Sequence, residues 1–162
     1  MPQAGLDIAK WGLVAAALSL VLFAAFLDIR RFVIPNWISL SVLALGLIYV
    51  VVADAPHWTG HGLAALLVFA VGVVLFALRL LGGGDVKLMT AISLWSGFDF
   101  LMGFSVVTAL AGGALSLFYL VRAIRGHKAD GVEAVLKARI PYGVAIAAGG
   151  VYVFISITGH LG

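Results

Sequence analysis

The chain of 162 residues contains no cysteine, and this absence removes several classes of protein at once. Without thiols it can hold no disulfide framework, no thiolate zinc site and no cysteine nucleophile. Charged residues are also scarce, at 10% of the chain, whereas 64% of it is hydrophobic and the mean hydropathy is +1.18. This composition excludes an ordinary soluble domain and indicates an integral membrane protein. The basic residues lie between apolar stretches and do not form one stripe, which argues against a nucleic-acid partner.

The N-terminal stretch lacks the features of a cleaved signal peptide. Met1 to Trp11 carries Asp7 and Lys10 where a basic n-region would stand, and no small-residue cleavage site leads into a soluble domain. We therefore expect the first apolar segment to remain in the mature protein. We also expect residues 1–162 to form a single membrane domain in contact with the lipid bilayer.

Six apolar segments can be placed along the chain. A helix needs about 20 apolar residues to cross a hydrocarbon core about 30 Å thick. The sequence predicts an all-α membrane protein with spans at Trp11–Leu27, Trp37–Ala53, Gly62–Leu81, Val86–Gly97, Phe100–Val121 and Tyr142–Thr158. The fourth span is short: about a dozen residues give a helix about 18 Å long. A turn at one of its ends must then lie below the membrane surface, where protein or a water-filled cavity has to satisfy the backbone.

The basic residues set the orientation of this predicted bundle. With six spans, every lysine and arginine except Lys10 falls on one side of the membrane. The positive-inside rule makes that side cytoplasmic and leaves both termini outside. Asp28 and Asp85 then lie at the cytoplasmic ends of their spans.

The connection between the fifth and sixth spans has the pattern of a short amphipathic helix. Asp130 followed by Glu133 resembles an N-terminal cap, and Glu133 with Lys137 forms an i,i+4 pair. We expect Gly131 to Arg139 to lie as a helix on the inner membrane surface.

Small residues recur at three- and four-residue spacing in the last two predicted spans. Such residues allow helix backbones to approach closely in lipid. The positions are Ala109, Gly112, Gly113, Ala145, Gly149 and Gly150. They predict close helix packing and require no chemistry.

The main candidate for a functional site is the segment Gly82-Gly83-Gly84-Asp85, which interrupts an otherwise apolar sequence. An acid beside such a break at membrane depth is a candidate functional residue, although Asp85 could simply cap the next helix at the lipid–water boundary. Of the seven acids, only Asp28 and Asp85 are predicted to meet in a membrane-side cleft. Two carboxyl groups at one site share a proton, so the ionised member can activate water while the neutral member polarises a peptide carbonyl.

Other polar residues support weaker alternatives. His57 and His61 have the i,i+4 spacing of a metal pair, but Pro56 and Gly60 indicate a loop and a third ligand is missing. Their predicted position on the outer side also disfavours a serine protease. We therefore expect no metal and no cofactor. Lys87 would not face Asp85 on a helix; it could bind a substrate carboxylate or a lipid headgroup.

Three blocks of sequence resemble one family. They are Asp28-Ile29-Arg30-Arg31-Phe32-Val33-Ile34-Pro35-Asn36, the Gly-x-Gly-Asp motif at Gly82–Asp85, and Arg139-Ile140-Pro141-Tyr142-Gly143-Val144-Ala145. Together with the six-span layout, they resemble the type IV prepilin peptidases, a class of membrane aspartic proteases. The resemblance extends over essentially the whole chain.

The resemblance implies a catalytic role for Asp28 and Asp85. It implies that they cleave the short basic leader of a prepilin at the cytoplasmic face of the bacterial inner membrane, just before the hydrophobic N-terminal helix of the pilin. It also implies roles for the neighbouring residues. Gly82 and Gly84 would leave room for the substrate backbone, Pro35 would end the turn after Asp28, and Asn36 would bind that turn. Pro141, Tyr142 and Gly143 would open the sixth span.

One departure from the family narrows the expected activity. Larger members carry an additional N-terminal cytoplasmic region with zinc-binding cysteines, associated with methylation of the new pilin N-terminus. This cysteine-free chain lacks that zinc and methyltransferase domain, so the resemblance implies a peptidase alone, most like the short enzymes for Flp-type pilins of tight-adherence systems. A preflagellin peptidase of the archaeal type is the alternative enzyme. From other classes, a small transporter with a broken helix or a non-catalytic membrane subunit of a secretion apparatus is the alternative.

Overall fold

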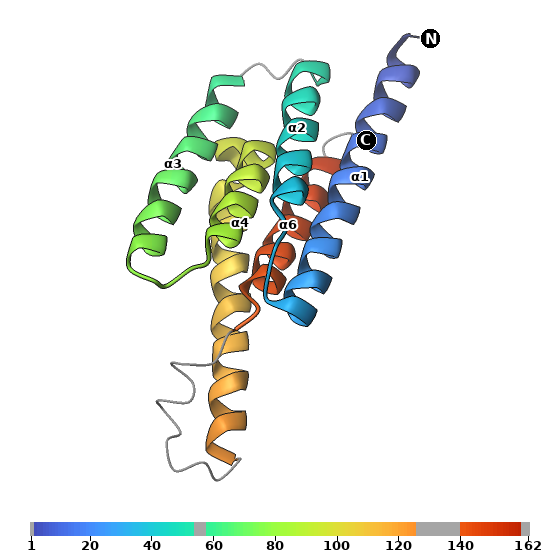
Figure 1. Ribbon diagram of the computed structural model, residues 1–162. Coiled ribbons are helices and arrows are strands. Elements are labelled where there is room, and N and C mark those ends of the chain that lie inside the picture. Colours follow the sequence, from blue (N-terminus) through green and yellow to red (C-terminus); the bar gives the residue numbers. More distant parts are fainter. Residues whose placement is uncertain (1, 54–57, 126–139, 160–162) are drawn as a thin grey trace.

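The computed structural model describes residues 2–53, 58–125 and 140–159, and every regular element within them is an α-helix (Figure 1). The helices are α1 (Pro2–Arg31), α2 (Asn36–Val52), α3 (Trp58–Ala77), α4 (Gly83–Arg125) and α6 (Tyr142–Gly159). The predicted all-α class is confirmed. The predicted interfacial helix Gly131–Arg139 lies outside the described residues.

Four of these helices are long and apolar enough to cross a membrane: α1, α3, α4 and α6. Helix α2 is equally apolar but has only 17 residues. The described chain therefore has fewer candidate spans than the six predicted. One reason is that α4 contains two predicted spans, Val86–Gly97 and Phe100–Val121, as a single kinked element.

The kink in α4 is at Gly97. Its φ of 54° and ψ of −163° lie in a region that is essentially restricted to glycine, and they divide α4 into two arms, 83–96 and 98–125. A ring nitrogen of His61 on α3, Nδ1, lies 2.8 Å from the carbonyl oxygen of Leu94. This contact supplies a partner to a carbonyl beside the break, where the regular helical ladder is interrupted.

The two arms of α4 fold back on each other and both pack against α6. Gly150 of α6 faces Ile92 of the first arm, while its neighbour Gly149 faces Thr108 of the second arm. Figure 1 shows the chain rising through the first arm and descending through the second, which extends beyond the ends of the other helices. Helix α4 is thus a helical hairpin.

Trp95 forms the centre of the core and is fully buried. Its indole N–H donates to the carbonyl oxygen of Val42 on α2 at 2.9 Å, and Gly46 leaves space for the ring. The ring stacks on Tyr49 with centroids 5.0 Å apart and meets the edge of Phe154 on α6 at 5.2 Å. One side chain of the first arm therefore fixes α2 and α6 relative to α4.

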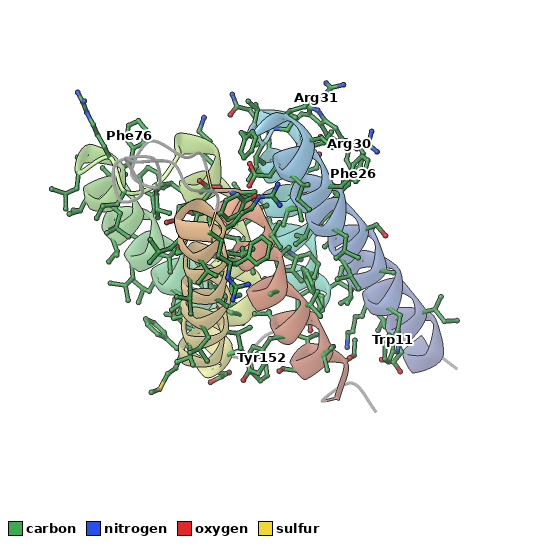
Figure 2. All side chains as sticks on the ribbon, turned by 90° about the horizontal axis from the view of Figure 1, so that it is seen from below. Trp11, Phe26, Arg30, Arg31, Phe76 and Tyr152 are labelled. Atoms are coloured by element: carbon green, nitrogen blue, oxygen red, sulfur yellow. The ribbon has the colours of Figure 1, made fainter. Side chains whose placement is uncertain are left out.

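The arrangement brings five helix ends together at one end of the bundle. The C-terminal ends of α1 and α3 lie there with the N-terminal ends of α2, α4 and α6 (Figure 1). Helix α1 contacts α2 and α6, and within the described chain it has no direct backbone contact with α4. At this end Arg30 and Arg31 lie on the outward side of α1, with the Arg30 guanidinium 4.6 Å from the Phe26 ring (Figure 2).

Candidate active site

Asp28 lies near the C-terminal end of α1 and is only 6% exposed. The backbone N–H of Gly143 donates to its carboxylate oxygen Oδ2 at 2.7 Å. Gly143 is the second residue of α6, and the first N–H groups of a helix have no partner within the helix. The carboxylate therefore caps α6 from a position 115 residues away in the chain, at the end where the helix dipole favours negative charge.

The bond between Asp28 and α6 requires a glycine at position 143. A Cβ built at Gly143 would lie 2.8 to 3.0 Å from three atoms of the Asp28 side chain. The third sequence block was predicted to open the last span, and α6 does begin at Tyr142. The structure adds that this opening holds an acid of the first block.

Asp85 is the third residue of α4 and is half-buried. Its Oδ2 accepts the backbone N–H of Gly82 at 3.0 Å. Gly82 immediately precedes the helix, so this bond is the half of a capping box in which the third residue reaches back to the N-cap. Asp85 thus does cap α4, but from inside the helix rather than from the N-cap position considered in the sequence.

The two acids lie at the same end of the bundle. Asp28 is bound at the start of α6, and Asp85 lies in the first turn of α4. The turn after Asp28 also packs directly on the start of α4, because Ile34 lies 3.2 Å from where a Cβ of Gly84 would stand. Sequence reasoning missed this buried isoleucine, although it stands beside Pro35 in the first block.

A second link joins the same two segments. Lys87 donates from Nζ to Oδ1 of Asn36, the first residue of α2, at 2.9 Å. Asn36 was expected to bind the backbone of the preceding turn, whereas the structure shows it accepting from Lys87. In the described chain the side chain of Lys87 is thus hydrogen-bonded to Asn36. Pro35 is the N-cap of α2, with φ of −62°.

The glycines of the Gly-x-Gly-Asp motif have structural roles in this arrangement. The space beside Gly82 holds the Asp85 carboxylate, and the space beside Gly84 holds Ile34. These contacts explain the need for glycine without a substrate, so the predicted role in substrate access stays a prediction. The turn after Asp28 also contains Phe32 at a φ of 51°, a left-handed conformation costly for a bulky residue.

The weaker alternative of a metal pair at His57 and His61 gains no support from the described part of the chain. His61 contacts Leu94 at the kink of α4, and His57 lies outside the described residues. No group of three or more possible metal-binding side chains occurs among the described residues.

The sequence was compared with models of known protein families. The family model of the type IV leader peptidases matches residues 15–117, which is more than half of the chain. The chain belongs to the type IV leader peptidase family. The match includes Asp28 and Asp85 and ends before Gly143. The hydrogen bond from Gly143 to Asp28 therefore joins α6, which lies outside the matched residues, to an acid inside them. Searches of curated proteins and of solved structures give no match.

Proposed function

We propose that this leader peptidase is an aspartic endopeptidase that removes the leader from type IV prepilins, with Asp28 and Asp85 as the catalytic pair. The observation that carries the proposal is the presence of both acids at one end of the bundle. They come from helices without direct backbone contact in the described chain, and each lies where a helix begins: Asp28 at the start of α6 and Asp85 in the first turn of α4. Each accepts the N–H of a glycine, Asp28 from Gly143 of the third sequence block and Asp85 from Gly82 of its own block.

The pair supports the following reaction. The ionised carboxylate takes a proton from water, and the protonated carboxyl group polarises the carbonyl of the peptide bond to be cleaved. The water oxygen adds to the carbonyl carbon, and the leaving amine receives a proton as the carbon–nitrogen bond breaks. The backbone bonds from Gly143 and Gly82 keep both side chains in position and require no metal or cofactor.

Charge distribution supports a cytoplasmic site. Arg30 and Arg31 end α1 beside Asp28, and Lys87 follows Asp85, whereas Lys10 lies near the far end of α1. The positive-inside rule then puts the acids on the cytoplasmic face of the inner membrane and both termini outside. In this orientation each arm of α4 and the short α2 would count as a span, giving six.

The length of the first arm supports a recessed site. Residues 83–96 form a helix about 21 Å long, which is shorter than a hydrocarbon core of about 30 Å. At least one end of this arm, either the start beside Asp85 or the kink at Gly97, would therefore lie below the membrane surface, and we place the recess at Asp85. The Flp type of substrate rests on the resemblance of this cysteine-free sequence to the enzymes for Flp-type pilins alone.

The test is leader removal from a co-expressed Flp-type prepilin in membranes. Asp28→Asn and Asp85→Asn should each lower the cleavage rate by about 10²- to 10⁴-fold, the usual contribution of a general acid or base. Asp99→Asn changes an exposed aspartate at the opposite end of the bundle and should leave the rate unchanged. Wild-type cleavage by either site variant, at equal membrane insertion, would rule out the catalytic pair.

A further inference from the structure

An apolar cavity of about 520 Å³, here called the lateral cleft, lies between α3, both arms of α4 and α6. Its walls include Leu67 and Val71 of α3, Leu101 and Ala109 of the second arm, and Ala145 of α6. All of the described residues that line it are uncharged. Its size is in the range of ligand-binding cavities in proteins, and its lining is as apolar as theirs.

The lateral cleft begins beside the two acids. Its lining includes Leu81, which precedes the Gly82 that binds Asp85, and Tyr142, which precedes the Gly143 that binds Asp28. Met89, one turn after Asp85, also lines it. A chain whose peptide bond lay at the acids would therefore have the cleft immediately next to it.

From the acids the lateral cleft extends into the membrane-spanning part of the bundle. Gly112 of the second arm lies at the level of Tyr142, with 3.8 Å between a Cβ built there and the tyrosine ring. Leu101, at the other end of the lining, lies eleven residues before Gly112 in the same arm, about 16 Å deeper. The cleft thus runs along the direction that a membrane-spanning substrate would follow.

Two small residues in the lateral cleft lack the packing that their spacing predicted. A Cβ built at Gly149 meets Thr108 and Phe104, as expected for closely packed helices. A Cβ at Gly113 has nothing within 4 Å among the described residues, and Ala109 is exposed. Small residues with an open face allow another backbone to come close in lipid.

We propose that the lateral cleft binds the apolar segment of the substrate that follows the cleaved bond. This inference rests on the proposed function and adds the surface that selects the substrate. The uncharged lining selects apolar side chains, the start of the cleft at both acids sets the register of cleavage, and Ala109 and Gly113 admit the substrate backbone. A lipid chain is the competing occupant.

Gly113 offers a direct test because a larger side chain there enters the cleft without striking the protein. The Michaelis constant for a full-length prepilin is measured with Gly113→Ala, Gly113→Leu and Gly113→Phe. We expect it to rise with side-chain size, by about tenfold for leucine, which corresponds to about 1.4 kcal/mol. The kcat should change less than twofold. Gly62→Leu is the matched control, because a Cβ at Gly62 also has open space and Gly62 does not line the cleft.

A binding measurement separates recognition from cleavage. Prepilin should bind Asp85→Asn protein about tenfold more tightly than protein carrying both Asp85→Asn and Gly113→Leu. Equal Michaelis constants for Gly113→Leu and Gly62→Leu would overturn the inference. It would also be overturned if the Gly113→Leu protein lost a co-purified lipid while its affinity for prepilin stayed unchanged. If the wild-type protein binds prepilin through the cleft but cleaves none, the proposed function fails while the cleft assignment stands.

Discussion

At the scale of single residues, a backbone N–H rather than a side chain holds Asp28. The donor belongs to Gly143, and the space around this glycine is filled by the Asp28 side chain itself. The position of the acid therefore depends on the absence of a Cβ. Misplacing a catalytic group by about 1 Å can cost about 10²-fold in rate.

We accordingly expect Gly143→Ala to lower prepilin cleavage by about 10²-fold. The added methyl group must push the Asp28 side chain out of its place, because it would lie 2.8 Å from the carboxylate oxygen Oδ2 and 2.9 Å from Cβ. Cleavage is measured in membranes at matched expression. Gly62→Ala adds a methyl group in open space and should cleave at the wild-type rate. An active Gly143→Ala variant would show that this contact does not set the position of Asp28.

Gly83 and Gly84 form a second matched pair. A Cβ at Gly84 would stand 3.2 Å from the side chain and carbonyl of Ile34, whereas one at Gly83 would stand at an ordinary 3.6 Å from Phe76. Because Ile34 belongs to the turn after Asp28, we expect Gly84→Ala to reduce kcat severalfold and Gly83→Ala to leave it unchanged. Single-turnover cleavage assays measure both. Equal rates for the two variants would contradict a positioning role for this contact.

Sequence reasoning identified the two acids but could not identify what holds them. Acids are so scarce in this chain that topology alone reduced seven candidates to Asp28 and Asp85. The bond to Gly143 joins residues 115 apart, and it arises only when α6 packs beside α1. Ile34 was missed for the same reason, since an apolar residue in an apolar chain gives no local signal of its contacts.

At the scale of elements, the hairpin of α4 depends on the kink at Gly97. The φ and ψ of this residue are costly for any side chain, and the ring of His61 lies 3.1 to 3.3 Å from where a Cβ would stand. The kink carries the first arm, and with it Asp85, back along the second arm.

We therefore expect Gly97→Ala to destabilise the protein by about 1–3 kcal/mol, the usual cost of a strained backbone conformation. His61→Ala leaves the Leu94 carbonyl without this contact and should cost about 0.5–1.5 kcal/mol. Thermal unfolding in detergent micelles measures both. Gly12→Ala, on an exposed face of α1 with open space, should not lower the stability. A Gly97→Ala protein as stable as wild type would show that the kink tolerates a side chain.

The helix bounds show what hydropathy can and cannot predict. The first span was expected over Trp11–Leu27, yet α1 continues through Asp28 to Arg31. Charged residues mark the edge of the lipid but do not end a helix, and here Asp28 gains its partner from α6. Similarly, Gly60 and Gly62 do not delay the start of α3, because glycine only weakens a helix.

At the scale of the whole molecule, the proposed orientation in the membrane can be tested without first removing any native cysteine. The chain has no cysteine, so a single introduced thiol reports on its own position. We expect Arg31→Cys and Arg122→Cys, both exposed at the end that carries the acids, to be shielded from a membrane-impermeant maleimide in intact cells. Trp58→Cys, exposed at the start of α3, should react in intact cells.

The pattern of labelling decides between orientations. The wild-type chain is the unlabelled control, and opening the cells should make all three thiols reactive. Labelling of Arg31→Cys but not Trp58→Cys in intact cells would invert the topology and remove the acids from the cytoplasmic face.

The contact between Gly143 and Asp28 also has a consequence for genetics. Every single-nucleotide change that replaces a glycine by another amino acid adds a Cβ, and none introduces proline, so none removes the backbone N–H. We therefore expect no amino-acid replacement reachable in one step at codon 143 to be neutral, whereas a replacement of Gly113 meets open space. Saturation mutagenesis under selection for the proposed prepilin cleavage would separate the two glycines by their tolerance alone.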